Sequence, residues 1–198
     1  MPEETEHAVE VLRKGDFVIL RKRIESDRDH YNRWQKEGEW REYDAPWQST
    51  VAEEKPAQEQ KAKPKTAEVA VGVEKMAVIT TLDGFPLGWV NRYGKKYRSD
   101  AFFVGIDICV DDYLNQGYGT EALGLWVDYL FAHSEVHKIG LDTWSFNPRM
   151  VRVAEKIGFK YEGRQREMQF WQGEWLDLLH FGILREEWSR IESRKPRA

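Results

Sequence analysis

The chain has 198 residues, of which 41% are hydrophobic and 13% aromatic, a composition typical of one folded domain with a substantial core. Its 30 basic and 34 acidic residues give a net charge of −4, which excludes the strongly basic surface of a typical nucleic-acid-binding protein. The lack of a roughly 20-residue apolar run, of a signal-peptide core and of a second cysteine beside Cys109 predicts a cytoplasmic protein that does not bind membranes.

The first third of the chain predicts a strand, a helix and then an insertion. Strand-forming residues occupy positions 16–22, and Ser26 or Asp27 is suited to cap a helix that ends near residue 35. Residues 49–70 are mostly Ala, Glu, Lys, Gln and Pro and include no aromatic side chain. Such a segment buries too little apolar surface to offset the cost of ordering it, so we expect an exposed, mobile insertion. A charged helical arm is the alternative, which the two prolines disfavour.

The rest of the chain predicts an α/β domain. In chain order we expect strands at 76–81, 86–92 and 101–110, a helix at 118–132, a strand at 138–144, a helix at 148–156, and strands at 159–170 and 175–184. Because a helix separates the strands at 101–110 and 138–144, these two strands should be parallel. The order predicts one mixed α/β domain over residues 10–188, interrupted at 49–70, and a polar tail at 189–198.

A glycine-containing turn between the strand at 101–110 and the next helix is the most informative stretch. Gly117 and Gly119 lack Cβ atoms, so the backbone there can approach a ligand closely. A strand, a glycine turn and a helix N-terminus in succession gather backbone N–H groups that bind phosphate. Two glycines at this spacing also occur in ordinary turns, so the turn alone leaves both interpretations open.

Three blocks of sequence surround and follow this turn. The first runs from Gly105 through Asn115-Gln116-Gly117-Tyr118-Gly119-Thr120 to Ala122, the second from Phe146-Asn147 to Gly158-Phe159, and the third covers residues 162–167. In this order and spacing they resemble the GNAT superfamily of acetyl-CoA-dependent N-acetyltransferases, and most closely its ribosomal-protein N-terminal acetyltransferase-like branch. The resemblance covers residues 76–188 well and residues 15–47 weakly.

The resemblance implies a fold and a cosubstrate. A mostly antiparallel central sheet with flanking helices would contain one splayed parallel strand pair, here 101–110 and 138–144, with the pantetheine arm of acetyl-CoA in the gap. The residues that would bind acetyl-CoA are Ile108, Cys109 and Val110 through their main chain, Asn115, Gln116, Gly117, Tyr118, Gly119 and Thr120 around the diphosphate, and Asn147 beside the arm. No metal is expected, and a homodimer is left open.

The implied activity is that of an acyltransferase, which moves the acetyl group of acetyl-CoA to a primary amine by direct attack in a ternary complex. The acceptor could be a protein N-terminus, a polyamine, an aminoglycoside or another small amine. A CoA-binding regulatory module that has lost catalysis is the alternative function. Nucleotide binding by a Rossmann motif is a weaker alternative, because that motif places its glycines after the first strand of the fold.

Acetylation of an amine requires a base, because fewer than about one in a thousand lysine-like amines are neutral at pH 7. Asp107 is our candidate base, acting through water, since it lies in an otherwise apolar strand where burial would raise its pKa. A structural carboxylate is the alternative interpretation, and Asp142 is a weaker candidate for the base. Asn147 is a further catalytic candidate, although the same residue suits the cap of the following helix.

Three positions depart from the pattern of the family. Leu114 stands where many members have Gln or Arg, a change that a cradle of backbone N–H groups tolerates. Met150 and Ala154 stand where many members have the Ser or Tyr that protonates the leaving thiolate. The general acid is therefore absent, supplied by water or substrate, or another residue such as Tyr161.

Four further residues have a structural and a functional interpretation. Trp34 and Tyr43 fall where the substrate-side helices of the family lie, so they either wall the acceptor site or pack in the core. Cys109 is expected to be a small core residue rather than a nucleophile. His180 is expected to pack in the last strand rather than to take part in catalysis.

Overall fold

The computed structural model describes residues 9–47, 72–95 and 98–192. The elements are β1 (Val11–Lys14), β2 (Val18–Arg21), α1 (Asp27–Trp34), a 3-10 turn η1 (Glu39–Glu42), β3 (Met76–Thr81), β4 (Pro86–Lys95), β5 (Arg98–Ile108), a 3-10 turn η2 (Asp111–Tyr113), α3 (Tyr118–His133), β6 (Lys138–Trp144), α4 (Pro148–Ile157), β7 (Lys160–Trp171), β8 (Glu174–Leu184) and α5 (Arg185–Glu192). The expected insertion at 49–70 lies outside the described residues.

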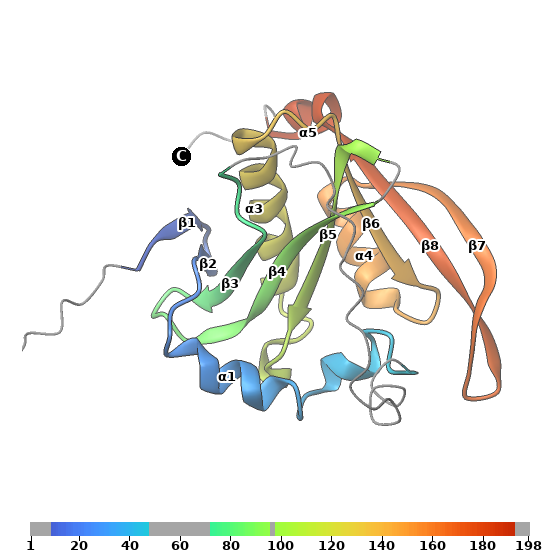
Figure 1. Cartoon of the computed structure of the whole chain (residues 1–198), viewed down its shortest axis with the longest axis horizontal. Coiled ribbons are helices and arrows are strands. Elements are labelled where there is room, and N and C mark those ends of the chain that lie inside the picture. The colour runs from blue at the N-terminus through green and yellow to red at the C-terminus, as the bar shows by residue number, and fades with distance from the viewer. Residues whose placement is uncertain (1–8, 48–71, 96–97, 193–198) are drawn as a thin grey trace, which may run out of the picture.

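Eight strands form one sheet in the order β1-β2-β3-β4-β5-β6-β8-β7, flanked by four α-helices in the described part of the chain (Figure 1). All neighbouring strands are antiparallel except β5 and β6. These two are parallel because α3 carries the chain back along the sheet between them. The prediction of a mixed α/β sheet with one parallel strand pair is confirmed.

The parallel pair is short, and this is the feature of the fold that positions the site. Residues 101–103 of β5 pair with residues 138–140 of β6, whereas β5 continues to Ile108 and β6 to Trp144. Gly140 belongs to the last pair, and the ring of Phe103 lies 2.5 Å from the place where a Cβ of residue 140 would stand. Beyond this pair the two strands separate, so their facing backbone edges are not paired with each other.

The core lies between the sheet and the helices that pack on it. Leu123, Trp126, Val127 and Leu130 form one face of α3 at helical spacing and are all fully buried. This face packs against β2 and β5, while α4 packs against α3 and β6. The two helices thus flank the region in which β5 and β6 separate. None of the described helices is both long and apolar enough to cross a membrane.

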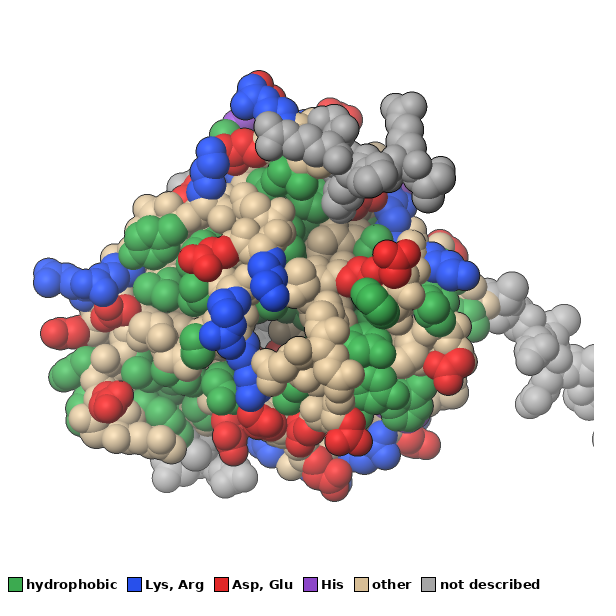
Figure 2. Space-filling model, turned by 180° about the vertical axis from the view of Figure 1, so that it is seen from behind, with side chains coloured by type: hydrophobic (Ala, Val, Ile, Leu, Met, Phe, Trp, Pro, Cys, Tyr) green, Lys and Arg blue, Asp and Glu red, His purple; other side chains and the backbone are tan. Residues whose placement is uncertain are grey.

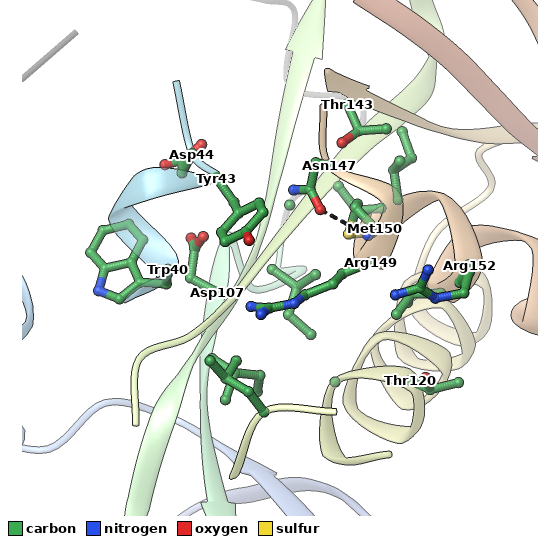
Figure 3. A pocket seen from close by; sticks show the side chains of 18 of the residues that line it. Trp40, Tyr43, Asp44, Asp107, Thr120, Thr143, Asn147, Arg149, Met150 and Arg152 are labelled. Atoms are coloured by element: carbon green, nitrogen blue, oxygen red, sulfur yellow. Dashed lines mark hydrogen bonds between the residues drawn. The ribbon is translucent and has the colours of Figure 1, made fainter. Parts of the chain in front are cut away.

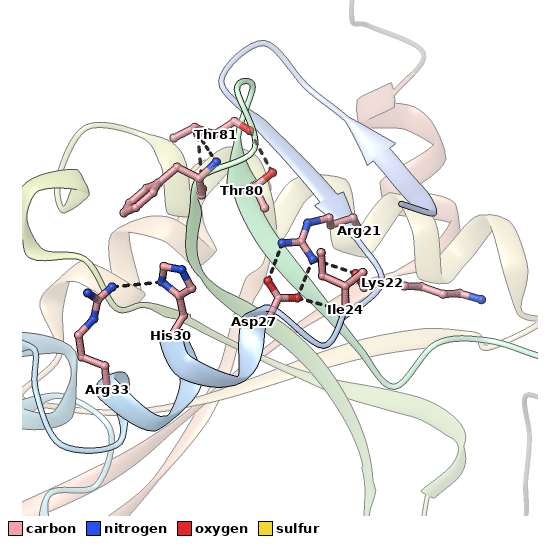
Figure 4. Close-up of polar contacts among 9 residues, drawn as sticks. Arg21, Lys22, Ile24, Asp27, His30, Arg33, Thr80 and Thr81 are labelled. Carbon is pink, nitrogen blue, oxygen red and sulfur yellow. Dashed lines mark hydrogen bonds and ion pairs between the residues drawn. The ribbon is translucent and has the colours of Figure 1, made fainter. Parts of the chain in front are cut away.

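A buried ion pair ties α1 to β2 (Figure 4). The guanidinium of Arg21 donates from Nη1 and Nη2 to the carboxylate of Asp27 at 2.7 and 2.6 Å, and the N–H of Ile24 donates to the same carboxylate at 2.9 Å. Ser26 stands at the N-cap but makes no side-chain capping bond. Of the two expected caps, only Asp27 binds backbone at this helix start, and it does so from the first turn.

Glu121 connects the β1–β2 turn to the start of α3. Its carboxylate accepts hydrogen bonds from the backbone N–H groups of Asp16, Phe17 and Val18 at 2.7, 2.8 and 2.9 Å. A Cβ at Gly15 would lie 2.5 Å from this carboxyl group, so glycine allows the close approach. The carboxylate of Glu121, in the first turn of α3, therefore has its hydrogen-bond partners within the protein.

We expect the Glu121→Ala variant to lower the free energy of unfolding by about 1–2 kcal/mol, because three partly exposed N–H groups lose a charged acceptor. Urea denaturation measures this loss. The matched control is Glu135→Ala, which removes an exposed carboxylate just after the same helix and should change stability by less than about 0.5 kcal/mol. Equal stabilities of the two variants would contradict the assigned role of Glu121.

One strand and one α-helix were not predicted, and each depends on tertiary contacts. β1 is a four-residue strand whose one neighbour among the described strands is β2. α5 makes the first residues of the expected polar tail helical. Arg185 holds its start by donating to the carbonyls of Phe131, Ser134 and Val136 at 2.7, 2.6 and 3.0 Å. Such contacts across the chain leave no periodic signal in a short segment.

Charged side chains of both signs are spread over the face seen in Figure 2, and several Lys and Arg side chains gather near its middle. The mixture agrees with the near balance of acidic and basic residues in the sequence. The mixed charges of this face do not indicate a binding surface of one charge sign, so we look for the functional site in a cavity.

Candidate functional site

A cavity of about 620 Å³ opens where β5 and β6 separate (Figure 3). Residues from η1, β4, β5, the glycine turn, β6 and α4 line it. Of the predicted site residues, it brings together Tyr43, Asp107, Ile108, Asn115, Gly117, Gly119, Thr120 and Asn147. The wall does not include Trp34, Cys109, Val110, Gln116 or Tyr118.

The β5 edge of the cavity presents alternate backbone groups to the gap. The N–H of Cys109 donates to the carbonyl of Leu87 at 2.7 Å, on the side of β4. Because backbone groups alternate along a strand, the main-chain groups of Ile106 and Ile108 point the other way, into the gap. Of the three residues predicted to offer main-chain partners, Ile108 is thus placed to do so.

The backbone N–H of Cys109 faces β4 and not the gap. Its side chain is buried with Trp34 and Trp89 in a small cluster that Tyr31 and Trp40 also contact. Burial, with smaller contributions from nearby carboxylates, raises the pKa of this thiol well above its usual range. This environment suits the core residue that the sequence predicted, and it also places Trp34 in packing rather than at the cavity wall.

The glycine turn forms the second wall of the cavity. Gly117 has a left-handed φ of 96° and precedes the first residue of α3. The first bond of the helix runs from the N–H of Glu121 to the carbonyl of Gly117 at 3.0 Å, so the N–H groups of residues 118–120 have no partner within the helix. A Cβ on Gly119 would stand 3.5 Å from Ile108, so the turn also lies close to the β5 edge.

Two predicted residues of this turn face away from the cavity. The Gln116 side chain donates to the carbonyl of Asp112. The Tyr118 ring contacts Tyr113 edge-on, with ring centroids 5.1 Å apart. Their side chains stabilise the turn, and only their backbone groups remain candidates for binding a ligand.

The start of α4 forms the third wall. Asn147 caps the helix, because its Oδ1 accepts the N–H of Met150 at 3.0 Å, and its amide nitrogen points toward the cavity (Figure 3). Both proposed functions of this residue, as a helix cap and as a contact to a ligand, are therefore compatible. Ala154 is fully buried and does not reach the cavity.

Three basic side chains of α4 line the cavity and were not singled out from the sequence. They are Arg149, Arg152 and Lys156. Their spacing of three and four residues places them on one helical face, which is the signal that could have found them. Arg152 and Thr120 lie on the same side of the cavity, away from Asp44 and Asp107 (Figure 3). Arg152 therefore gives this side of the cavity a positive charge, whereas Arg149 lies over the Tyr43 ring, nearer to Asp107.

Carboxylates line the opposite end of the cavity. Asp44 and Asp107 lie there (Figure 3), and Asp142 also lines the cavity. Burial raises the pKa of Asp107 to about 8, the negative charge of Asp44 adds to this shift, and a hydrogen bond from the Trp89 side chain opposes it. Asp142 accepts from or pairs with His180, whose Nδ1 lies 2.8 Å from Oδ1. His180 thus has the polar partner that a half-buried packing residue on this strand needs.

Aromatic residues of η1 and of its C-cap cover the acidic end. Trp40 and Tyr43 line the cavity. The guanidinium of Arg149 lies 4.6 Å from the centre of the Tyr43 ring and also pairs with Glu39 at 2.5 Å. These contacts hold the η1 segment against the start of α4, across the cavity from β5.

The site can be compared with known proteins. The family model of the acetyltransferase (GNAT) domain matches residues 18–160. The SPbeta prophage-derived uncharacterized N-acetyltransferase YokL of Bacillus subtilis (strain 168) is 31% identical over 77 residues, which are 39% of this chain and 44% of YokL. The chain therefore spans less than half the length of this curated relative.

Two solved structures resemble the fold. The spermidine N-acetyltransferase of Vibrio cholerae, in complex with CoA and spermine, superposes with a TM-score of 0.65 at 21% identity, covering 87% of this chain and 98% of that one. RimL, a ribosomal L7/L12 alpha-N-protein acetyltransferase in complex with CoA, superposes with a TM-score of 0.68 at 16% identity, covering 90% and 99%. At these identities the likeness concerns the fold.

Proposed function

The chain belongs to the acetyltransferase (GNAT) domain family and is an acyltransferase of the N-acetyltransferase type, and from this premise we propose that it acetylates a primary amine inside the cavity between β5 and β6. The acetyl donor is acetyl-CoA, and the amine attacks directly in a ternary complex. The observation that carries the proposal is that Arg152 and the N-terminal turn of α3 lie on one side of the cavity, while Asp44 and Asp107 lie on the other.

The donor side of the cavity fits a long phosphorylated thioester. The separated edge of β5 offers the main-chain groups of Ile106 and Ile108 to a pantetheine arm, as an additional strand would meet them. The N–H groups of residues 118–120 and the positive end of α3 suit the diphosphate. Arg152 and Lys156 line the same cavity and would bind further phosphate. When bound, acetyl-CoA supplies an acetyl group activated as a thioester.

The acceptor side of the cavity fits a positively charged amine. Asp44, Asp107 and Asp142 line it, and within the described residues Asp44 has no ion-pair partner. Asp107 would take the proton of the bound amine through water, since its raised pKa matches that task near neutral pH. A polyamine or an aminoglycoside carries several positive charges that these carboxylates would attract, whereas they would repel the acidic neighbours of some protein N-termini.

The second candidate is a CoA-binding regulatory module without catalysis. Met150 and the buried Ala154 support it, because these two residues of α4 cannot donate a proton, whereas many members of the family carry Ser or Tyr at one of the two positions. The two candidates differ in one observable. Both bind CoA, but only the enzyme releases free CoA at a rate that depends on the amine.

We expect acetyl-CoA to bind at tens of micromolar or tighter in a calorimetric titration. The Gly119→Asp variant should bind at least about 100-fold more weakly, because a carboxylate at the helix N-terminus would repel the diphosphate. The matched control is Gly124→Asp on the same helix, where a Cβ meets nothing within 4 Å, and its affinity should be unchanged.

A CoA-release assay over a panel of amines then separates the two candidates. The panel contains spermidine, an aminoglycoside, a small monoamine, and peptides with acidic and neutral N-termini. Release that depends on the amine supports the enzyme, and the polycations should give the highest kcat/KM. Tight acetyl-CoA binding without release for any amine would favour the regulatory module, and no binding by the wild-type protein would overturn both candidates.

A further inference from the structure

None of the three positions considered from the sequence, 150, 154 and 161, supplies a proton donor for the leaving thiolate inside the cavity. Ala154 is fully buried, and Met150 carries no transferable proton. Tyr161, the substitute that the sequence suggested, is 55% exposed on β7, where its ring contacts Phe181, and it does not line the cavity. A donor must therefore come from another wall of the cavity.

We propose that Tyr43 is the general acid of the reaction, an inference that rests on the proposed acetyl transfer. In the transfer, the amine nitrogen forms a bond to the acetyl carbon, and the carbon–sulfur bond breaks with its electron pair remaining on sulfur. The phenol of Tyr43 gives its proton to the sulfur and so yields the CoA thiol. The proton that the amine loses, taken by Asp107 through water, restores the phenol, so charge and protons balance over one turnover.

Contacts from two elements hold Tyr43 at the cavity. Its ring stacks on Phe146 with centroids 6.3 Å apart and an angle of 18° between the planes. The Arg149 guanidinium covers the ring at 4.6 Å, and Glu39 fixes that guanidinium through the ion pair at 2.5 Å. Phe146 directly precedes Asn147, so Tyr43 stands at the start of α4, the helix whose first and second turns carry Met150 and Ala154 in place of a donor.

The hydroxyl of Tyr43 is available to a ligand. Within the described residues it has no hydrogen-bond partner. Figure 3 shows the side chain reaching from η1 toward α4, between Asp107 and Arg149. The charged groups around it are Arg149 from α4, Asp107 from β5, and Glu39 and Asp44 from its own segment. The acid and the proposed base thus share one end of the cavity.

The other hydroxyl groups of the cavity are less suited to the task. Burial and the charges of Asp142 and Asp44 raise the pKa of Tyr93, so its proton is held more tightly. Tyr113 belongs to η2 and stacks on Phe85 at 6.2 Å, beside the glycine turn where the diphosphate would lie. Thr120 and Thr143 also line the cavity, but aliphatic hydroxyls are much weaker acids than a phenol.

We test the proposal with Tyr43→Phe, which keeps the ring and its contacts to Phe146 and Arg149. In the CoA-release assay, kcat should fall about 100-fold, at the low end of general acid catalysis because a thiolate is already a moderate leaving group. The matched control is Tyr161→Phe, a phenol on β7 that does not line the cavity, which should change kcat by less than about 3-fold.

A binding measurement gives a readout that does not depend on activity. If the Tyr43 hydroxyl contacts the sulfur, Tyr43→Phe should bind CoA about 3- to 10-fold more weakly than the wild type, the value of one hydrogen bond. It should bind desulfo-CoA, in which hydrogen replaces the thiol, with unchanged affinity. Equal losses for both ligands, or no loss for CoA, would overturn the contact.

The pH profile separates catalysis from positioning. Site-specific incorporation of 3-fluorotyrosine at position 43 makes the phenol more acidic, so the alkaline limb of kcat should move to lower pH, which a structural ring would not cause. An unmoved limb would overturn the role of Tyr43. If wild-type protein releases no CoA with any amine, the proposed function itself fails and this inference fails with it, whereas an active wild type with an equally active Tyr43→Phe variant overturns Tyr43 alone.

Discussion

The Asp107→Asn variant is expected to lower kcat/KM for amine acetylation by about 1000-fold, within the range of general base catalysis. Asparagine keeps the size of the side chain but cannot accept the proton of the bound amine. The titration with acetyl-CoA should be unchanged, because the donor side of the cavity is not altered. The CoA-release assay measures the loss, and Asp142→Asn is the matched control, since it removes the other strand carboxylate of the cavity and should cost less than about 10-fold.

The raised pKa of Asp107 predicts the direction in which kcat/KM changes with pH. The pKa of Asp107 is about 8, so the base is mostly protonated at pH 6 and becomes available as the pH rises through 8. The wild-type kcat/KM should therefore rise over this window and level off above it, and the rise should be absent in Asp107→Asn. A wild-type profile that is flat between pH 6 and 9 would contradict the assignment of Asp107 as the base.

The same shift has a consequence for stability. The folded state holds the proton of Asp107 up to about pH 8, whereas an unfolded chain releases it near pH 4. The carboxyl group therefore destabilises the folded protein increasingly between these values. Asp107→Asn should raise the melting temperature relative to the wild type, and the difference should grow from pH 5 to pH 8. Thermal unfolding at several pH values tests this directly.

The Asp27→Ala variant is expected to lower the free energy of unfolding by about 3–5 kcal/mol, the range for removing one partner of a buried ion pair. Asp27 is 1% and Arg21 6% exposed, so the guanidinium would remain buried without its carboxylate. Chemical denaturation measures the loss. The control is the double variant Arg21→Met and Asp27→Leu, which removes both charges and should recover most of the stability.

The stability from Asp27 also has a defined pH window. Burial alone would raise its pKa, but the hydrogen bonds from Arg21 and from the Ile24 N–H outweigh burial and lower it. The contribution is therefore complete above the pKa of the unfolded carboxyl, near 4, and is lost as the pH falls below it. The gap between wild type and Asp27→Ala should be full at pH 7 and shrink in acid, and a constant gap would contradict the ion pair.

Local sequence signals predicted most of the fold. The period of apolar residues identified α3, and Asn147 and Gly158 bounded α4, which the structure shows with the predicted cap and a left-handed end at φ 108°. The helix between two strands required the parallel pair β5–β6. These signals depend on a few consecutive residues, so they can be identified without knowing which distant residues pack against them. α5 and β1 depend on distant partners and were missed for that reason.

The site was predicted in part, and the limit is again the range of the interactions. The glycine turn, Asp107 and Asn147 come together at one cavity because the order of the elements brings them there. By contrast, Cys109 packs with Trp34 and Trp89 instead of lining the cavity, and this packing depends on α1 and β4, which are distant from it in the chain. The contact of Tyr43 with Arg149 joins segments more than 100 residues apart, and the local sequence of neither segment predicts it.

The sequence by itself thus determined the α/β order, the glycine turn before α3, and the membership in an acetyltransferase family, since short motifs at regular spacing carry these properties. Only the tertiary structure decided how far β5 and β6 separate, which charges meet at each end of the cavity, and why the pKa of Asp107 is raised. Burial, charge and the direction of a side chain are properties of packing, and packing depends on residues that are distant in the chain.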